Sequence, residues 1–348
     1  MAEPKAFTGK TAALIGAGRM GRSHALALRE LGVTITAVCD RRPESVEKFA
    51  TEFDVPADRA TTDADRFFED LGTPDILVIA TTAETHCDLT CKGADAGARA
   101  ILCEKPMATS VEDCETMLAR CRKAGVKLAI NHQMRFMDQY SLVKSELESG
   151  RLGTLASMNV VAGAFGLAMN GSHYIEAFHY LTGQWPDRVS AIFNGEPINN
   201  PRGPDFFDQG GNILFQTAGG PRLSLSIGHD QGHGMTVTYA GTWGHIFVDE
   251  LQGSAIVTAR KPEHRDAPNT RFGMPWDRQE ISFPQADNVG PTKAVMEALL
   301  TGENYPDGDS GHRIVAALAS SYASAEQGGS PVEIASNTDM HQRKFPWA

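Results

Sequence analysis

The sequence predicts two domains: an α/β domain with a doubly wound parallel sheet, followed by an α+β domain with an open, mostly antiparallel sheet. Three observations support this fold class. Apolar strand patterns alternate with helix patterns up to about residue 133. A glycine-rich turn separates the first strand from the first helix. Beyond residue 133, strand patterns follow one another with short turns between them. We therefore expect one domain over residues 1–133 and another over residues 134–348.

In the first domain the strand patterns alternate with helix patterns, as a parallel sheet requires. The strands are short apolar runs, which is typical of strands that are buried on both faces. Gly32 and Gly125 end two of the helices, Ser110 begins the helix that Gly125 ends, and Pro43 begins a third. The expected elements are strand Thr11–Gly16, helix Met20–Gly32, strand Val33–Asp40, helix Pro43–Phe53, strand Asp75–Ala80, helix Thr85–Ala96, strand Ala100–Glu104, helix Ser110–Ala124 and strand Val126–His132.

The second domain consists mainly of strand patterns joined by hairpin turns, which predicts an antiparallel meander. Glycine and proline interrupt these patterns at Gly219–Pro221 and at Gln252–Gly253. Helices are expected near Gln139–Ser149, over Gly171–Thr182 and, as two further helices, towards the end of the chain. The expected strands are Leu155–Val161, Arg188–Phe193, Asn212–Gln216, Arg222–Gly228, Met235–Ala240, His245–Glu250 and Ser254–Arg260.

Composition argues against two classes of partner. The chain has 348 residues, a formal net charge of −11 and a pI near 5.5, whereas nucleic acids and anionic membranes require a basic face. We find no apolar run of about 18 residues and no basic segment that precedes an apolar one. We therefore expect a cytoplasmic protein without a transmembrane helix or a signal peptide.

The cysteines point to reduced core thiols rather than to disulfides. They lie in the first half of the chain and form no C-x-x-C pair. A metal site built on Cys87 and Cys91 is the alternative, but no second pair accompanies them. The six cysteines are Cys39, Cys87, Cys91, Cys103, Cys114 and Cys121.

The glycine-rich turn contains Gly16, Gly18 and Gly21 in the spacing G-x-G-x-x-G. It follows a strand and opens a helix, so backbone N–H groups at the helix N-terminus can approach a pyrophosphate. Asp40 ends the second strand, 19 residues beyond Gly21, where a carboxylate accepts hydrogen bonds from the adenosine ribose. This combination predicts a Rossmann domain that binds a dinucleotide. It favours NAD, because the carboxylate repels a 2′-phosphate.

Neighbouring side chains complete the expected cofactor site. Arg19 and Met20 lie between the second and third glycines and are expected to contact the dinucleotide. Arg41 and Arg42 follow the acidic residue and leave NADP open, because an arginine there can hold the extra phosphate.

Polar side chains also follow two later strands, where ligands bind in a doubly wound sheet. Thr81 and Thr82 follow one apolar strand and are expected to line the cofactor. His86 is expected to contact the cofactor, with an ordinary position in the first turn of a helix as the alternative. Glu104 and Lys105 follow the next strand, so both are expected on the ligand side of the sheet.

With this context, the segment Glu104-Lys105-Pro106 resembles the Gfo/Idh/MocA family, which includes glucose–fructose oxidoreductase and inositol dehydrogenase. The resemblance covers nearly the whole chain. It implies that Lys105 lies near the nicotinamide, hydrogen-bonds the reacting oxygen and, with a lowered pKa, shuttles a proton. It also implies that Glu104, beside the cofactor, positions Lys105, and that the bond to Pro106 is often cis. Other segments that resemble the family are Asn131–Tyr140, Gly241–Glu250 and Asp307–Ile334.

The segment Gly166–Gly183 carries the second catalytic residue that the resemblance implies. Family members commonly have a histidine in a G-x-H segment, with an aspartate four residues earlier, and both face the substrate. His173 matches the histidine, but Met169 stands in place of the acid. We expect His173 to be catalytic, with a capping or core histidine as the alternative, and Asn170 to contact substrate. Glu176 follows on the same helix face and is expected to hold His173.

Two further positions leave alternatives open. Arg135 is expected either to contact substrate or to brace the interface. His229 and His233 are four residues apart, but three glycines surround them, so no helix is expected there. A mobile loop is the favoured interpretation and a metal site the minority one, so we expect no metal site in this chain.

The expected function is NAD(P)-dependent hydride transfer between nicotinamide and a secondary alcohol or ketone of a sugar, cyclitol or sugar derivative. The change at Met169 favours a sugar nucleotide or amino sugar over a simple inositol. One alternative is a redox-neutral enzyme that keeps its NAD and cleaves a glycoside through transient oxidation. Another is a non-catalytic dinucleotide-binding sensor, although the presence of both Lys105 and His173 argues against it. The resemblance also implies a homodimer or homotetramer that pairs through the open sheet.

Overall fold

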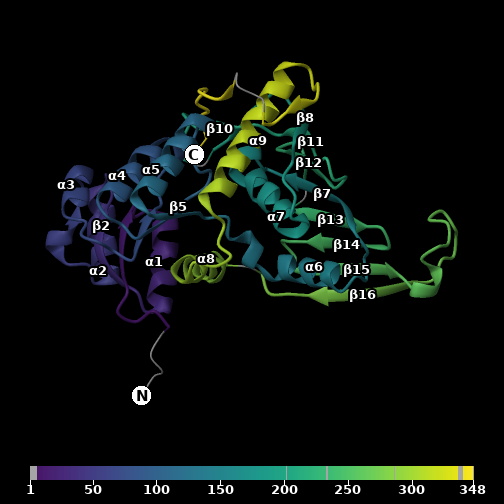
Figure 1. The fold of residues 1–348 in the computed structure, drawn as a ribbon, viewed down its shortest axis with the longest axis horizontal. Helices are drawn as coiled ribbons and strands as arrows, with labels where there is room; N and C mark the ends of the chain where they lie inside the picture. The colour runs from purple at the N-terminus through teal and green to yellow at the C-terminus, as the bar shows by residue number, and fades with distance from the viewer. Residues whose placement is uncertain (1–5, 201, 233, 286, 336–339, 348) are drawn as a thin grey trace. The chain divides into compact units, whose positions relative to one another are not determined.

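The computed structural model describes residues 6–200, 202–232, 234–285, 287–335 and 340–347, and the chain forms two compact units (Figure 1). The first unit comprises Met1–Gln133, Asp287–Val315 and His341–Ala348, and the second comprises Met134–Ala286 and Ala316–Met340. The first unit thus includes two segments that lie beyond the predicted range 1–133.

The first unit is built on a six-stranded, fully parallel sheet with the strand order β3-β2-β1-β4-β5-β6. The order reverses between β1 and β4, which is where ligands bind in a doubly wound sheet. The sequence did not predict β3 or the short helix α3 (Ala64–Glu69). The strands are β1 (Thr11–Ile15), β2 (Thr34–Cys39), β3 (Ala60–Thr61), β4 (Ile76–Ile79), β5 (Ala100–Cys103) and β6 (Lys127–Ile130).

Helices cover this sheet, and their ends follow the sequence signals. Every residue of β4 and β5 is buried, as expected for strands between two helical layers. Gly32 and Gly125 end α1 and α5 in the left-handed conformation, with φ of 82° and 70°. The Ser110 side chain caps α5 by accepting the Asp113 N–H at 3.2 Å. The helices are α1 (Arg19–Leu31), α2 (Pro43–Phe53), α4 (His86–Asp95) and α5 (Val111–Ala124).

Two later segments of the chain return to the first unit. Helix α8 (Val289–Thr301) packs beside α1 (Figure 1), and Lys293 forms an ion pair with Glu30 at 3.0 Å. Near the end of the chain, the Phe345 N–H donates to the Thr109 carbonyl oxygen at 2.9 Å. Trp347 is 1% exposed and stacks on Phe345, so the C-terminal segment is part of this core.

The second unit contains a nine-stranded sheet with the order β16-β15-β14-β13-β7-β12-β11-β8-β17. Most neighbours are antiparallel, as predicted, but β7 and β12 pair in parallel. The predicted meander is therefore wrong at the centre of the sheet, because β7 inserts between β12 and β13, which are consecutive in sequence. The strands are β7 (Leu155–Gly163), β8 (Arg188–Phe193), β11 (Gly211–Gln216), β12 (Arg222–Gly228), β13 (Thr236–Gly241), β14 (Gly244–Asp249), β15 (Ser254–Arg260), β16 (Trp276–Ser282) and β17 (Val332–Glu333).

One face of this sheet is buried and the other is partly open, because side chains alternate along each strand. The C-terminal part of helix α9 (Gly308–Glu326) packs at the β8 edge of this sheet, where the Ser324 hydroxyl accepts the Ala191 N–H at 2.9 Å. On the other face, Ile192 is 62% exposed at the rim of a depression of about 430 Å³ that β7, β8, β11 and β12 line. Helices α6 (Asp138–Glu148) and α7 (Ser172–Thr182) also belong to this unit.

Among the described residues, every helix is too short or too polar to span a bilayer.

Candidate functional site

The glycine turn leads from β1 into α1, and two of its glycines have reasons within the protein itself. Gly16 has a φ of 98°, and a Cβ there would lie 2.5 Å from the Ala80 carbonyl oxygen. A Cβ on Gly21 would collide with the Gly16 carbonyl oxygen. These positions therefore need glycine for the fold, whether or not a ligand binds.

Gly18 differs, because packing within the described residues does not require it to be glycine. Its φ is −74°, and a Cβ would meet only the flexible end of Arg42 at 3.7 Å. Gly18 is the N-cap of α1, where no described side chain accepts a hydrogen bond from the free N–H groups. A side chain at residue 18 would therefore fill an open cradle in front of a helix N-terminus. This geometry fits the pyrophosphate of a dinucleotide.

Asp40 lies at the carboxyl end of β2, beside the glycine turn, and is 9% exposed. Its Oδ2 accepts the Ala17 N–H at 2.8 Å, and its Oδ1 accepts the Arg42 N–H at 3.0 Å. Arg42 Nε also lies 3.3 Å from Oδ1. Asp40 therefore stabilises the glycine turn through the Ala17 N–H, and it lies where the adenosine ribose is expected to bind. Arg19 and Arg41 are exposed, and Met20 is half-buried.

The segment after β4 carries the two predicted threonines and His86. Thr81 and Thr82 are half-buried, and the Thr85 hydroxyl lies 2.7 Å from the Thr81 hydroxyl. The His86 side chain is 0% exposed, with Nδ1 3.0 Å from the Pro106 carbonyl oxygen and Nε2 3.3 Å from that of Thr81. Both ring nitrogens thus lie near backbone carbonyl oxygens, and a cofactor contact by His86 stays a prediction.

Glu104 forms the centre of a buried polar cluster at the carboxyl end of β5. It is 2% exposed, and its Oε1 lies 2.8 Å from His24 Nε2 and accepts the Asn131 amide N–H at 2.9 Å. Burial alone would raise the pKa of Glu104, but the hydrogen bond and charge of His24 and the charge of Lys105 outweigh it. The pKa of Glu104 is therefore lowered, and the group is a carboxylate.

The sequence interpretation missed His24 and Asn131. Signals for both were present: His24 is a polar residue on the apolar face of α1, and Asn131 directly follows the apolar strand β6. Lys105 is half-buried, its backbone N–H donates to Glu104 Oε2 at 3.2 Å, and its bond to Pro106 is cis.

In the second unit, His173 lies in the first turn of α7 and is 7% exposed. A π-helical turn, Leu167–Gly171, precedes it and carries Met169 and the half-buried Asn170. Asp208, which is 2% exposed, accepts the Met169 N–H at 2.7 Å. A buried carboxylate from β10 (Phe207–Asp208) is thus bonded to the backbone of the turn that carries Met169. No local signal in the sequence linked these segments.

Arg135 and Glu176 form a buried ion pair within the second unit. Arg135 Nε donates to Glu176 Oε1 at 2.8 Å, and the Arg135 guanidinium lies 5.1 Å from the centre of the Tyr180 ring. These contacts hold Arg135 within the second unit, and the interpretation that it braces the interface stays a prediction. They also give Glu176 a partner other than the expected His173. A substrate contact by Arg135 stays a prediction.

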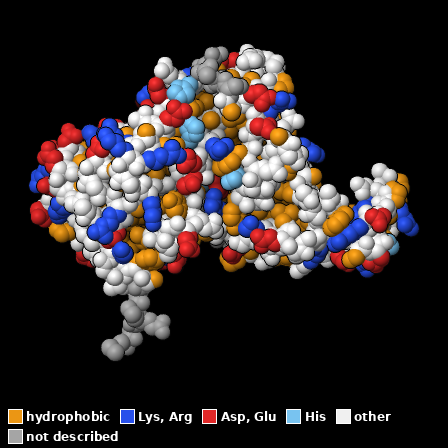
Figure 2. Space-filling view, viewed as in Figure 1, with side chains coloured by type: hydrophobic (Ala, Val, Ile, Leu, Met, Phe, Trp, Pro, Cys, Tyr) orange, Lys and Arg blue, Asp and Glu red, His pale blue; other side chains and the backbone are white. Residues whose placement is uncertain are grey.

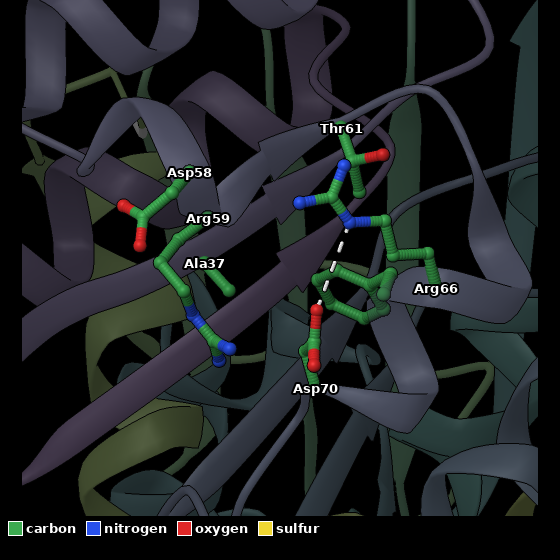
Figure 3. Close-up of a pocket in the computed structure, with 7 residues that line it drawn as sticks. Ala37, Asp58, Arg59, Thr61, Arg66 and Asp70 are labelled. Carbon is green, nitrogen blue, oxygen red and sulfur yellow. Dashed lines mark ion pairs between the residues drawn. The ribbon is translucent and has the colours of Figure 1, made fainter.

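Other candidate sites are small or incomplete. A cavity of about 10 Å³, with room for about one water molecule, lies near the β3 edge. Among its lining residues, which Figure 3 draws, Arg66 Nε lies 3.7 Å from Asp70 Oδ2. Among the described residues, no three His, Cys, Asp or Glu side chains are placed to hold a metal ion. His229 lies in a turn after β12, whereas His233 lies outside the described residues.

Charged side chains of both signs are interspersed over the face of the molecule in Figure 2.

Comparison with known proteins identifies the family. A sequence model described as "Oxidoreductase family, NAD-binding Rossmann fold" matches residues 10–132. Inositol 2-dehydrogenase of Rhizobium meliloti strain 1021 is 31% identical over 301 residues, which cover 80% of this chain and 88% of that protein. D-apiose dehydrogenase of Paraburkholderia graminis is 32% identical over 211 residues, which span 53% of this chain and only 55% of that relative.

Solved structures share the fold. Levoglucosan dehydrogenase, in complex with NADH and levoglucosan, superposes with a TM-score of 0.77 at 19% identity, covering 93% of this chain and 99% of that one. An inositol dehydrogenase homologue from Azotobacter vinelandii, in complex with NADH and myo-inositol, gives 0.75 at 17% identity, covering 94% and 98%. The family model agrees with the match to a relative over 88% of its length, and the chain belongs to the Gfo/Idh/MocA family of oxidoreductases.

Proposed function

We propose that this protein is an NAD-dependent dehydrogenase that acts on a secondary alcohol of a sugar, cyclitol or sugar derivative. The observation that carries the proposal lies within the first unit. The glycine turn follows β1, and Lys105 follows β5, with only β4 between these strands. A dinucleotide whose pyrophosphate binds at the N-terminus of α1, and which extends across the carboxyl ends of β4 and β5, would bring its nicotinamide towards Lys105.

The proposed cofactor contacts follow from this path. Backbone N–H groups of the glycine turn hold the pyrophosphate, and Asp40 holds the adenosine ribose. Thr81 and Thr82 line the dinucleotide after β4, between the pyrophosphate and the nicotinamide. Glu104 contributes at the nicotinamide end. When bound, the nicotinamide exchanges hydride with the carbinol carbon of the substrate.

Lys105 handles the proton of the reacting hydroxyl in this mechanism. An amine near the oxygen accepts the hydroxyl proton as hydride leaves the carbon, and returns it in the reverse direction. We propose His173, in the second unit, as the second group acting on that hydroxyl, because histidine titrates near neutral pH. Asn170 and Arg135 are the proposed substrate contacts near it.

The names of relatives support the substrate class. Inositol 2-dehydrogenase, D-apiose dehydrogenase and scyllo-inositol 2-dehydrogenase (NAD(+)) are all named for polyhydroxylated substrates. The methionine at residue 169 removes an ionisable group that the family resemblance places against the substrate. We therefore favour a sugar nucleotide or amino sugar over a simple inositol.

A turnover screen tests the proposal. Purified protein is mixed with NAD or NADP and a panel of cyclitols, sugars, amino sugars and sugar nucleotides, while reduced nicotinamide is followed by its absorbance. We expect turnover with NAD and one substrate class, lost in Lys105→Met and kept in Lys123→Met, which changes an exposed lysine on α5. Cofactor binding without turnover of any compound in the panel would contradict the proposed dehydrogenase activity and favour a non-catalytic dinucleotide-binding sensor. Product formation without a net absorbance change would favour the redox-neutral glycoside-cleaving alternative.

We also propose that the open face of the second unit pairs with another copy of the chain, giving a homodimer or homotetramer. The exposed Ile192 and the depression beside it support this, because exposed apolar sheet surface favours association. Light scattering is expected to give an oligomer for the wild type and a smaller species for Ile192→Asp. A monomeric wild type would contradict the proposal.

A further inference from the structure

Two fully buried histidines lie on either side of the Lys105–Pro106 dipeptide. His24 on α1 and His86 at the start of α4 are both 0% exposed. His24 contacts the residue before the dipeptide, Glu104, whereas His86 contacts Pro106 itself. Each histidine therefore connects the segment around Lys105 to a different helix of the first unit.

His24 acts on this segment through the carboxylate of Glu104. The carboxylate faces three donors: His24 Nε2 at 2.8 Å, the Asn131 amide at 2.9 Å and the Lys105 backbone N–H at 3.2 Å. Rotation of a buried carboxylate would leave its charge without these partners, which is costly. Since α1 begins at the glycine turn, this carboxylate links the cofactor-binding helix to Lys105.

His86 holds the other side of the dipeptide. Its Nδ1 lies 3.0 Å from the Pro106 carbonyl oxygen, and its Nε2 lies 3.3 Å from that of Thr81. Burial lowers the pKa of His86, so the ring is neutral near pH 7 and has one N–H to donate. The shorter contact favours donation to Pro106. His86 thus holds the Pro106 carbonyl oxygen from the start of α4.

We propose that His24 and His86 are positioning residues that fix the backbone of Lys105 for proton transfer. The inference rests on the role proposed above for Lys105. A lysine side chain has four rotatable bonds, so where its amine can reach depends on how firmly its backbone is held. Misplacement of a reacting group by about 1 Å can reduce a rate about 100-fold.

The alternative is that both histidines only stabilise the core. The partners of the two rings argue against it, because each ring contacts a polar atom of residues 104–106 or of the adjacent cofactor segment rather than a distant polar group. Donor-retaining variants separate the two interpretations. Glutamine places an N–H where His24 Nε2 lies, and asparagine places one where His86 Nδ1 lies, whereas leucine fills similar volume without a donor.

The first readout needs no cofactor or substrate. Hydrogen–deuterium exchange of peptides covering residues 104–109 is measured in the purified full chain for His24→Leu, His24→Gln, His86→Leu and His86→Asn. Leu31→Ala, a buried apolar change on the same helix as His24, controls for loss of stability alone. We expect about tenfold faster exchange in both leucine variants and near wild-type exchange in the glutamine, asparagine and Leu31→Ala variants. Equal exchange in donor-retaining and donor-free variants would overturn the inference.

The second readout is turnover with NAD and the substrate class found in the screen, with NADH affinity measured by fluorescence. We expect kcat to fall about 10- to 100-fold in the leucine variants and to recover within about threefold in His24→Gln and His86→Asn. NADH affinity is expected to stay within about threefold in the His24 variants. Faster exchange with unchanged kcat, while Lys105→Met is inactive, would overturn the positioning role. Full activity of Lys105→Met would instead refute the proposed function, and the exchange data would still decide whether the histidines hold this segment.

Discussion

Gly18→Ala and Gly21→Ala differ by the position of one methyl group, yet the structure predicts opposite consequences. In Gly21→Ala the new Cβ collides with the Gly16 carbonyl oxygen, a backbone atom that cannot move independently of the turn. We expect a loss of about 3 kcal/mol, the upper end of overpacking. For a unit of this size that lowers the melting temperature by about 6–12 °C.

In Gly18→Ala the new Cβ meets only the flexible end of Arg42 at 3.7 Å, and the backbone φ of −74° suits alanine. Loss of an N-cap glycine is expected to cost at most about 1 kcal/mol, or about 2–4 °C. The methyl group lies where the pyrophosphate is expected, so NADH affinity should fall about 10- to 100-fold, or about 1.4–2.8 kcal/mol.

The assays are thermal unfolding without cofactor and NADH titration by fluorescence. Gly18→Ala should fold normally and bind weakly, whereas Gly21→Ala should unfold early. Wild-type NADH affinity in Gly18→Ala would show that the cradle above residue 18 does not receive the cofactor. A Gly18→Ala variant as unstable as Gly21→Ala would show that packing requires glycine at residue 18. That result would refute the conclusion that Gly18 is needed for the cofactor alone.

Asp40→Ser should shift cofactor preference from NAD towards NADP by about tenfold or more, or about 1.4 kcal/mol, because the carboxylate that repels a 2′-phosphate is gone; unchanged ratios of kcat/KM would contradict the role of Asp40. Burial raises the pKa of Glu250, to which Tyr140 and Tyr174 donate at 2.8 and 2.7 Å. The folded state therefore binds this proton more tightly than the unfolded state, and the resulting stability is present at low pH and lost as pH rises through the folded pKa. Urea midpoints at pH 5, 6.5 and 8 should fall less with pH in Glu250→Gln than in the wild type, and parallel curves would argue against the shift. Trp347→Ala should lower the free energy of unfolding by about 3–5 kcal/mol, because its buried ring packs on Phe345; a change below about 1 kcal/mol in urea unfolding would mean that the C-terminal segment is not part of the core.

The elements of the first unit were predicted well because their signals are local. Apolar runs gave β1, β4 and β5 to within a residue or two at each end, and helix α2 matched its predicted bounds, Pro43–Phe53. Gly32 and Gly125 ended their helices because only glycine readily adopts the left-handed conformation there. The parallel pairing of β7 with β12 was not predicted, because pairing between distant strands leaves no local pattern in the sequence.

The sequence by itself determined the nucleotide-binding fold, the glycine turn, the position of Asp40 after the second strand and that of Lys105 at a strand end. Each of these features could be predicted because its residues are neighbours in the chain, or because they follow a strand whose place is set by the alternation of strands and helices. Only the tertiary structure brought His24 to Glu104, 80 residues away in sequence, and Asp208 to the turn that carries Met169. It also paired Arg135 with Glu176, as a buried ion pair. Such contacts depend on how helices and strands pack, and a buried polar side chain takes whichever partner that packing provides.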